Sequence, residues 1–402
     1  MDPRERDGPE GPNEPREPAG PEGPGRTVAP SRTVGPGTPG TPGAPDRDAF
    51  PARPGAEDGP PHPDAELLDR IVAGALTRID AMRPSFRLPA DVATDADPNL
   101  TLKPLGELAE LTDVVRACHP LPAVRALADD LFAFAWRETR DGALFAELVR
   151  GEPQATYPVE LYGVFARAGL RHPGAEELLA ATTRLRLWRL AREDHTRTLN
   201  VLNAERRVGL PQHADFAAVL ARTGLGARPE PWALDLRTAY GVTHDVFHVT
   251  DWGRTPWRMP AALAGYLRLW LPAWTTSWSE ERQWDLTGEL LAVAACTPGV
   301  PYDPFAWRVL AAAQHPDGAV PETGDGPPEG AAPEAWFTGC YHSTLVAAFA
   351  ATLARTAPAA CAGPRAPDAR GAATTAGPYP YPCPSPSADA PPPAPAESEV
   401  LP

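Results

Sequence analysis

The segment from Thr238 to Gly253 concentrates residues that could bind a metal or move protons. If this segment is helical, His244, His248 and Asp251 lie at i, i+4 and i+7 and project from one face. Two imidazoles one helical turn apart can share a divalent ion, and a carboxylate one turn further can complete or orient the site. The same spacing also occurs in helices whose histidines are only hydrogen-bonded core residues, so the pattern fits both interpretations.

A second candidate group opens the last strongly helical stretch, where Cys340 and His342 follow a long Gly/Pro-rich loop. At a helix N-terminus the macrodipole favours a thiolate, and the backbone N–H groups favour anions. Within a regular helix, positions i and i+2 project about 200° apart. We therefore expect both side chains to face one site only through the turn geometry at the helix start.

Together these two groups supply nitrogen, sulfur and oxygen donors for a zinc ion with an open coordination position. The predicted metal ligands are His244, His248, Cys340 and His342, and the predicted catalytic residues are His244, Asp251 and His342. This prediction requires the two stretches, almost a hundred positions apart, to meet inside the fold. Two alternatives remain open at this point: a polar pocket without metal, and histidines with a purely structural role.

A third group places Glu281, Asp285 and Glu289 at successive i+4 positions. Carboxylates at this spacing could bind Mg²⁺ or act as acid and base. We favour a solvated helix face instead, because like charges on such a face repel only mildly in water.

The elements that must position these residues are helices. Apolar residues recur with helical spacing almost everywhere from Asp64 onward, short Pro/Gly turns separate the periodic stretches, and no convincing period-two alternation occurs. The sequence predicts an all-α domain of about a dozen helices, either an α/α toroid or a helical repeat. Besides a first helix between Asp64 and Arg83, helices are expected over 105–117, 121–140, 157–168, 174–194, 196–206, 213–222, 236–250, 259–273, 279–295, 303–314 and 339–356.

Composition separates this domain from the two ends of the chain. The protein has 402 residues, and more than half of its 53 prolines lie in residues 1–63 and 358–402. Such ends bury too little apolar surface to offset the entropy of ordering them, so we expect two disordered tails around a helical domain at 64–357.

The net charge and the catalytic motifs missing from the sequence disfavour several classes of function. A net charge of −15 argues against a nucleic-acid partner. No run of eighteen apolar residues indicates a membrane span, and the charged, Pro/Gly-rich amino terminus lacks a secretory signal, so we expect a cytoplasmic protein with reduced thiols. Lys103 is the only lysine beside 36 arginines, a bias typical of GC-rich actinobacterial genomes. We find no Walker A, G-x-S-x-G or H-E-x-x-H motif, which disfavours nucleotide chemistry and serine hydrolysis.

The segment Gln314–Glu322, followed by Cys340-Tyr-His342, resembles the α/α-toroid superfamily of prenyltransferase β subunits, terpene cyclases and LanC-type lanthipeptide cyclases. Their helix pairs are often joined by a Q-x-x-D-G-like loop, which Gln314, Asp317 and Gly318 match once. Prenyltransferases and LanC proteins hold a central zinc through Cys and His, with an Asp in the former. By residue type, the resemblance implies Cys340, His342, His244 and Asp251 as the corresponding residues, and it covers at most residues 104–356.

The sequence also departs from these three enzyme classes. The D-x-D-D motif of terpene cyclases is absent, the prenyltransferase order D-x-C is replaced by C-x-H, and the two separated LanC cysteines are not evident unless Cys296 contributes. The likeness therefore points to a separate actinobacterial family of the superfamily. We expect an enzyme of specialised metabolism whose central polar, zinc-binding pocket acts on a peptide or isoprenoid, with a non-catalytic helical scaffold or peptide-binding protein as the alternative. The oligomeric state stays open.

Overall fold

A computed structural model describes residues 62–94, 96–190, 192–328 and 330–360 of the chain. Regular structure in these residues is helical, and the β contact recorded there is an isolated bridge between Gln283 and Thr323. The predicted all-α fold is confirmed. Nearly all of the two predicted Pro-rich tails, residues 1–63 and 358–402, lies outside the described residues.

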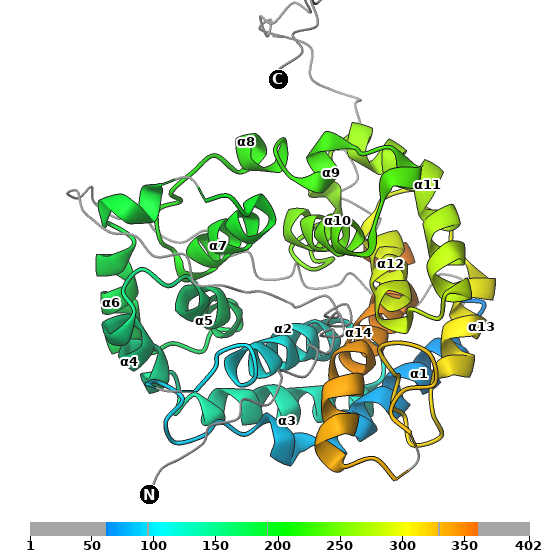
Figure 1. The fold of residues 1–402 in the computed structure, drawn as a ribbon, viewed down its shortest axis with the longest axis horizontal. Helices are drawn as coiled ribbons and strands as arrows, with labels where there is room; N and C mark the ends of the chain where they lie inside the picture. Colours follow the sequence, from blue (N-terminus) through cyan, green and yellow to red (C-terminus); the bar gives the residue numbers. More distant parts are fainter. Residues whose placement is uncertain (1–61, 95, 191, 329, 361–402) are drawn as a thin grey trace, which may run out of the picture. The chain divides into compact units, whose positions relative to one another are not determined.

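Six helices follow one another in a closed succession of contacts (Figure 1). Helix α14 packs against α2, α2 against α5, α5 against α7, α7 against α10, α10 against α12, and α12 again against α14. We call these six helices the inner circle. Their bounds are α2 Leu102–Cys118, α5 Tyr157–Arg167, α7 His195–Val208, α10 Leu236–Val249, α12 Trp284–Cys296 and α14 Pro333–Ala360.

The other helices pack against members of the inner circle or against one another. Helix α1 contacts α14 and α3, α3 contacts α2, α8 contacts α7, α9 contacts α10, and α11 contacts α12 and α13. Their bounds are α1 Ala65–Ala81, α3 Pro122–Glu138, α4 Ala143–Gly151, α6 Pro173–Thr182, α8 Phe216–Leu220, α9 Gly224–Ala227, α11 Ala261–Glu280 and α13 Pro304–Ala313. Short 3₁₀ helices cover Arg83–Phe86, Arg186–Arg189, Pro231–Ala233 and Pro256–Arg258.

Local sequence explains where many of these helices begin. The carboxylates of Asp194, Asp215, Asp235 and Asp303 each accept a backbone N–H of the helix that follows, which satisfies donors that the helix itself cannot pair. Asp64, which precedes α1, makes no such side-chain hydrogen bond. The apolar residues that recur with helical spacing along α1 are buried from Leu68 to Ile79.

Several helix boundaries differ from the prediction. The expected helix 174–194 ends at Thr182, a 3₁₀ turn follows, and the nine-residue helix α4 was not expected. Helix α11 continues past 273 to Glu280 with Pro272 inside it, and α12 begins only at Trp284. Arg282 lies between α11 and α12 and has a left-handed φ of 56°. It reverses the chain within the stretch 279–295, which was expected to form one helix.

The loop that matches Q-x-x-D-G fastens α1 to the end of α13. Gln314 Nε2 donates to Ile71 O at 3.1 Å, and Asp317 pairs with Arg78 at 3.1 Å. Gly318 has a φ of 93°, and a Cβ there would lie 2.0 Å from the carbonyl oxygen of Gly74, so the close approach requires glycine. These three residues therefore hold helices together.

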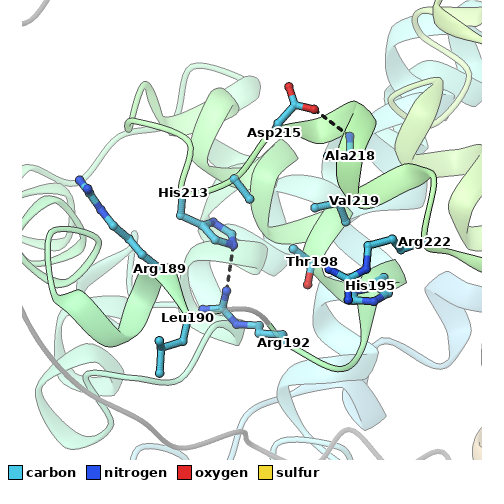
Figure 2. Close-up of a pocket in the computed structure, with 11 residues that line it drawn as sticks. Arg189, Leu190, Arg192, His195, Thr198, His213, Asp215, Ala218, Val219 and Arg222 are labelled. Carbon is cyan, nitrogen blue, oxygen red and sulfur yellow. Dashed lines mark hydrogen bonds between the residues drawn. The ribbon is translucent and has the colours of Figure 1, made fainter.

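A cavity of about 220 Å³ lies beside the 3₁₀ helix Arg186–Arg189 and is bordered by the first turns of α7 and by helix α8 (Figure 2).

Among the described helices, none has the length and apolar character needed to cross a bilayer.

Candidate metal centre

Four helices of the inner circle bring acidic and imidazole side chains together. Helix α12 supplies Asp285 and Glu289, which lie one turn apart and therefore share a face. Each of the two residues is only 1% exposed. Helix α14 supplies His342 and α10 supplies His244 to the same place.

The donor atoms converge at a characteristic spacing. His342 Nε2 lies 3.5 Å from Asp285 Oδ1 and 3.4 Å from Glu289 Oε1, and one ligand atom from each of these three residues lies within 4.8 Å of the others. Strong N–H···O hydrogen bonds are shorter, at about 2.9–3.0 Å. Tetrahedral zinc bonds of about 2.0–2.1 Å place neighbouring ligands about 3.3–3.4 Å apart. The two distances from His342 Nε2 match neighbouring ligands around an ion, and the contact with Glu289 also satisfies the geometry of a long hydrogen bond.

His244 reaches the same carboxylate from the other side. Its Nε2 lies 3.4 Å from Glu289 Oε1, the oxygen that His342 also approaches. The two stretches predicted to meet therefore approach each other at Glu289, with His244 from the first and His342 from the second, whereas the Cys340 thiol does not take part. The His244 side chain is recessed among these groups yet 40% exposed, so solvent or a ligand can contact it.

The second ring nitrogen of His342 faces another carboxylate. Its Nδ1 lies 3.0 Å from Glu107 Oε2, and Glu107 also accepts a hydrogen bond of 2.9 Å from Tyr341 Oη and pairs with Lys103. Metal-binding histidines commonly present their other nitrogen to a carboxylate, which fixes the ring orientation and raises ligand basicity.

The carboxylates of α12 are oriented in the same way. Tyr240 Oη donates to Asp285 Oδ2 at 2.7 Å, and Thr243 Oγ1 donates to Glu289 Oε2. These bonds use the oxygens that do not face His342. The oxygens Oδ1 and Oε1 are thereby directed towards the imidazoles.

Electrostatics favour positive charge at this point. Burial alone would lower the pKa of His342, but the carboxylates of Asp285 and Glu107 raise it to about 10. Burial would raise the pKa of Glu289, but the neighbouring His244 and His342 lower it well below its usual range. For His244, burial would lower the pKa, but the Glu289 carboxylate raises it above its usual value. The carboxylates thus attract a cation, whether an imidazolium proton or a divalent ion supplies the charge.

His248 lies one turn further along α10 and does not join the converging groups. Its ring centroid is 6.5 Å from that of His244, and its Nδ1 is buried without a hydrogen-bond partner among the described residues. Burial, and after it the charges of His244 and Arg207, lower its pKa well below the usual value. His248 is therefore a neutral core imidazole. Because it lies outside the group of converging donor atoms, the prediction that it is a metal ligand is corrected.

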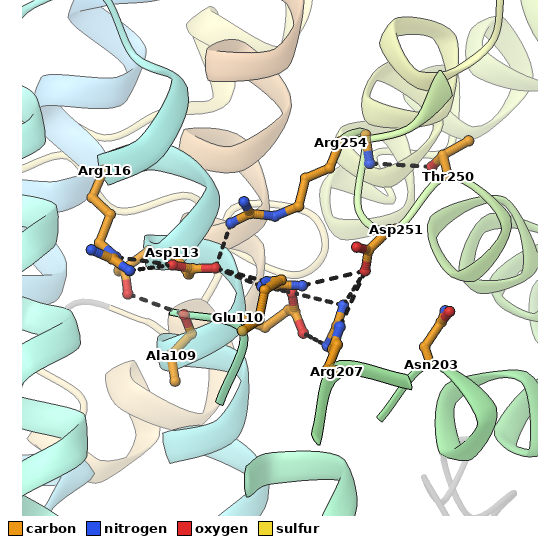
Figure 3. Close-up of polar contacts among 12 residues, drawn as sticks. Ala109, Glu110, Asp113, Arg116, Asn203, Arg207, Thr250, Asp251 and Arg254 are labelled. Atoms are coloured by element: carbon orange, nitrogen blue, oxygen red, sulfur yellow. Dashed lines mark hydrogen bonds and ion pairs between the residues drawn. The ribbon is translucent and has the colours of Figure 1, made fainter. Parts of the chain in front are cut away.

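Asp251 does not continue the helical face that the sequence analysis assumed. Helix α10 ends at Val249, and Asp251 has a left-handed φ of 48°. Its carboxylate is 2.6 Å from Arg207 Nη2 and 3.1 Å from Arg206 Nη2 (Figure 3). Burial would raise its pKa, but the arginines hold it well below the usual range. The prediction that Asp251 serves the histidines is corrected: it is held by guanidinium groups.

Asp251 belongs to a buried network that we call the arginine network, formed by Glu110, Asp113 and Asp251 with Arg116, Arg167, Arg206, Arg207 and Arg254. Figure 3 shows its labelled members Glu110, Asp113, Asp251, Arg116, Arg207 and Arg254. Arg207 pairs with Glu110 at 2.7 Å, and Arg167 contacts Glu110 at 2.5 Å and Asp113 at 2.6 Å. Burial would raise the pKa of Asp113, but Arg167, Arg254 and Arg116 lower it to about 2. The network joins α2, α5 and α7 of the inner circle.

Cys340 is buried away from the imidazoles. Helix α14 begins at Pro333, six residues earlier than expected, so Cys340 and His342 both lie inside a regular helix and project in different directions. Burial raises the pKa of the Cys340 thiol to about 11, and its charged neighbours are Arg78, Asp317 and Glu322. The predicted thiolate ligand at a helix start is therefore corrected.

Asp285 and Glu289 were predicted to lie with Glu281 on a solvated helix face, and for these two residues the prediction is wrong. Glu281 is exposed at the end of α11, as a solvated face predicts, whereas Asp285 and Glu289 are buried. Glu107 was missed altogether. The signal for it was the series Glu107, Glu110 and Asp113, with charges at i, i+3 and i+6 inside an otherwise apolar helix.

Comparisons with known proteins place the chain in a family. No curated protein and no solved structure matched it. Residues 72–352 match the family model described as Domain of unknown function (DUF6895). This match runs from α1 to α14 and spans every helix of the inner circle. The chain therefore belongs to the DUF6895 family.

Proposed function

We propose that this protein is a metal-dependent enzyme that holds a divalent transition-metal ion, with zinc as the best fit, between Asp285, Glu289 and His342. The observation that carries the proposal is the convergence of these three side chains: His342 Nε2 lies 3.5 Å from Asp285 Oδ1 and 3.4 Å from Glu289 Oε1, and all three ligand atoms lie within 4.8 Å of one another. Two carboxylates and one imidazole are three protein ligands, the number typical of catalytic zinc sites that keep one position open. No thiolate is included in this set.

The surrounding residues have distinct roles in this proposal. Glu107 orients His342 through Nδ1, while Tyr240 and Thr243 hold the outer oxygens of the two α12 carboxylates. A bound ion would supply Lewis-acid chemistry by polarising a carbonyl or phosphoryl oxygen. His244 is exposed to a ligand and lies beside Glu289, so it can hold a proton for transfer to or from a substrate.

A peptide or isoprenoid substrate, cytoplasmic location and a place in actinobacterial specialised metabolism are part of the same proposal and rest on the sequence. Membership of the α/α-toroid superfamily is supported by the closed succession of contacts in the inner circle together with the sequence resemblance. The closed succession gives the centre one lining helix after another, which suits a ligand surrounded by protein.

Metal analysis of the purified full-length chain tests the proposal. After incubation with zinc and removal of excess metal, we expect one equivalent of zinc in the wild type and in Cys340→Ala. Asp285→Asn and His342→Ala should each lose at least ten-fold in zinc affinity. Zinc binding that survives both of these changes but is lost in Cys340→Ala would overturn this ligand set in favour of the thiol.

Cobalt substitution gives an independent readout. A cobalt ion held by oxygen and nitrogen donors in a tetrahedral site should show strong visible d–d bands without a thiolate-to-metal charge-transfer band. Circular dichroism of each variant shows whether the helices persist. Folded wild-type protein that binds neither metal would overturn the metal centre and favour the scaffold alternative.

A further inference from the structure

A second place in the molecule has the properties of a ligand site, and it shares no lining residue with the candidate metal centre. The cavity of about 220 Å³ lies between the 3₁₀ helix Arg186–Arg189, the start of α7 and helix α8 (Figure 2). The arginine network contacts α7 at Arg207, twelve residues beyond His195, which corresponds to about 18 Å along the helix. The cavity is lined by His195 and Thr198 in the first turn of α7, and none of its lining residues belongs to the arginine network.

The lining of this cavity is positively charged in a chain whose net charge is −15. Arg189, Arg192 and Arg222 all border it. Within the described part of the chain, no carboxylate forms an ion pair with any of the three. The carboxylate in the lining, Asp215, accepts the backbone N–H of Ala218 at 2.7 Å and caps α8.

Arg192 is held in position from two sides. Its guanidinium carbon lies 5.2 Å from the ring centroid of Trp188, and its Nη1 is 2.9 Å from His213 Nε2. Because arginine keeps its protons, Arg192 donates and His213 Nε2 accepts. The proton of His213 is then on Nδ1, which donates to the buried Glu205 at 2.9 Å. His213 thus accepts from Arg192 at one ring nitrogen, and the Glu205 carboxylate lies beyond the imidazole rather than in contact with the guanidinium.

Burial removes part of the hydration of the Arg192 guanidinium, and the surrounding residues do not fully offset that loss. Arg192 is half-buried, and burial lowers its pKa more strongly than the more distant Glu160 and Glu205 raise it. A desolvated guanidinium gains most from an oxyanion, with which it can form two parallel charge-assisted hydrogen bonds. Apolar side chains, Leu190 and Val219, complete the lining.

We propose that this cavity binds a small metabolite through a phosphate or carboxylate group, which Arg192 contacts directly, while the exposed Arg189 and Arg222 add positive charge at its border. The volume is below the range of about 300–1,000 Å³ that holds drug-sized ligands, so the body of the metabolite is short. Leu190 and Val219 fit an apolar body better than a sugar or a second charged group.

Isothermal titration of the full-length protein with inorganic phosphate, and separately with succinate, tests this site at constant ionic strength. We expect saturable binding of at least one of the two probes, and the preferred probe identifies the oxyanion. Arg192→Gln should weaken that binding at least ten-fold. Arg222→Gln, an exposed position that is not expected to disturb folding, should weaken it by a factor of about three to five.

Two matched variants separate this site from other causes. Arg150→Gln removes an exposed arginine elsewhere and should leave binding unchanged, as should His342→Ala in the candidate metal centre. No saturable binding of either probe by the wild type would overturn the proposal. Equal binding by the wild type, Arg192→Gln and Arg222→Gln would also overturn it. Loss of zinc binding in His342→Ala with anion binding retained would show that the two sites stand independently.

Discussion

Neighbouring turns of helix α2 give the same kind of side chain two different environments. Glu107 faces the imidazole of His342, whereas Glu110 and Asp113 face the guanidinium groups of the arginine network. All three residues are carboxylates on one helix within two turns. What differs is the partner that the other helices supply.

The partners decide what each carboxylate can do. Guanidinium groups do not release protons, and they approach Glu110 and Asp113 at 2.5–2.7 Å in the arginine network. Such pairs keep their charges and hold helices together. Imidazoles gain and lose protons and bind metals, and around Glu289 they stand 3.4 Å away. The first environment is suited to structure and the second to chemistry.

The largest effect should follow from breaking the arginine network. The Arg207 side chain is 1% exposed, and Arg207→Met removes its ion pairs with Glu110 at 2.7 Å and with Asp251 at 2.6 Å, which leaves Arg167 as the cation that contacts both carboxylates. We expect a loss of about 3–5 kcal/mol in the free energy of unfolding, measured by urea denaturation. The matched control, Arg140→Met, breaks an exposed pair with Glu147 and should cost below about 1 kcal/mol. Equal losses in the two variants would contradict a structural role for the network.

Zinc should stabilise the folded protein by binding at the candidate metal centre. At a free zinc concentration of about one hundred times the dissociation constant, the wild type should gain about 2.7 kcal/mol, and a chelator should reverse the gain. Asp285→Asn should gain much less, because it removes an oxygen that faces His342. Asp325→Asn, at an exposed pair with Arg282, should respond like the wild type. A gain in Asp285→Asn as large as that of the wild type would exclude Asp285 as a ligand.

Acid should lower the free energy of unfolding by protonating Asp113 in the arginine network. Its pKa falls from 3.8 to about 2 on folding, so the folded state favours the ionised form. The resulting stability, about 2 kcal/mol, is present above pH 3.8 and is lost as the pH falls through 2. The difference in unfolding free energy between the wild type and Asp113→Asn should therefore shrink over this range. Two parallel pH profiles would contradict the assignment.

The smallest effect is expected at Cys340, on the other side of α14 from the imidazole. With a buried thiol whose pKa is about 11, Cys340 should resist alkylation at pH 8 in the native protein and react fully after unfolding. Peptide mapping by mass spectrometry measures this directly. Cys340→Ala should change the unfolding free energy by about 1 kcal/mol. Fast alkylation of the native protein would show an accessible thiolate.

The helices could be predicted from the sequence because each depends mainly on nearby residues. Apolar spacing defines the buried stripe of α1, and Pro/Gly turns mark most helix ends. The local reversal at Arg282 left no such mark, so α11 and α12 were misjudged. His244 and His342 were found as candidates because histidines on apolar helices are unusual.

The assembly of the site could not be read from spacing along one helix. Whether Asp285 and Glu289 face solvent or imidazoles depends on α10 and α14, which approach from distant parts of the chain. Asp251 was misplaced because the helix ends two residues before it. Cys340 was misplaced because α14 starts earlier than its last strong apolar run suggests.

The contacts of α14 with α1, α2 and α12 have a consequence for how the chain matures. Translation delivers α14 after every other member of the inner circle, so the succession of helices closes only once α14 has been made. Until then the acidic side chains of α12 have no His342 to neutralise them, and their mutual repulsion opposes early compaction. Arrival of the last helix therefore completes the architecture and the candidate reactive centre in a single event.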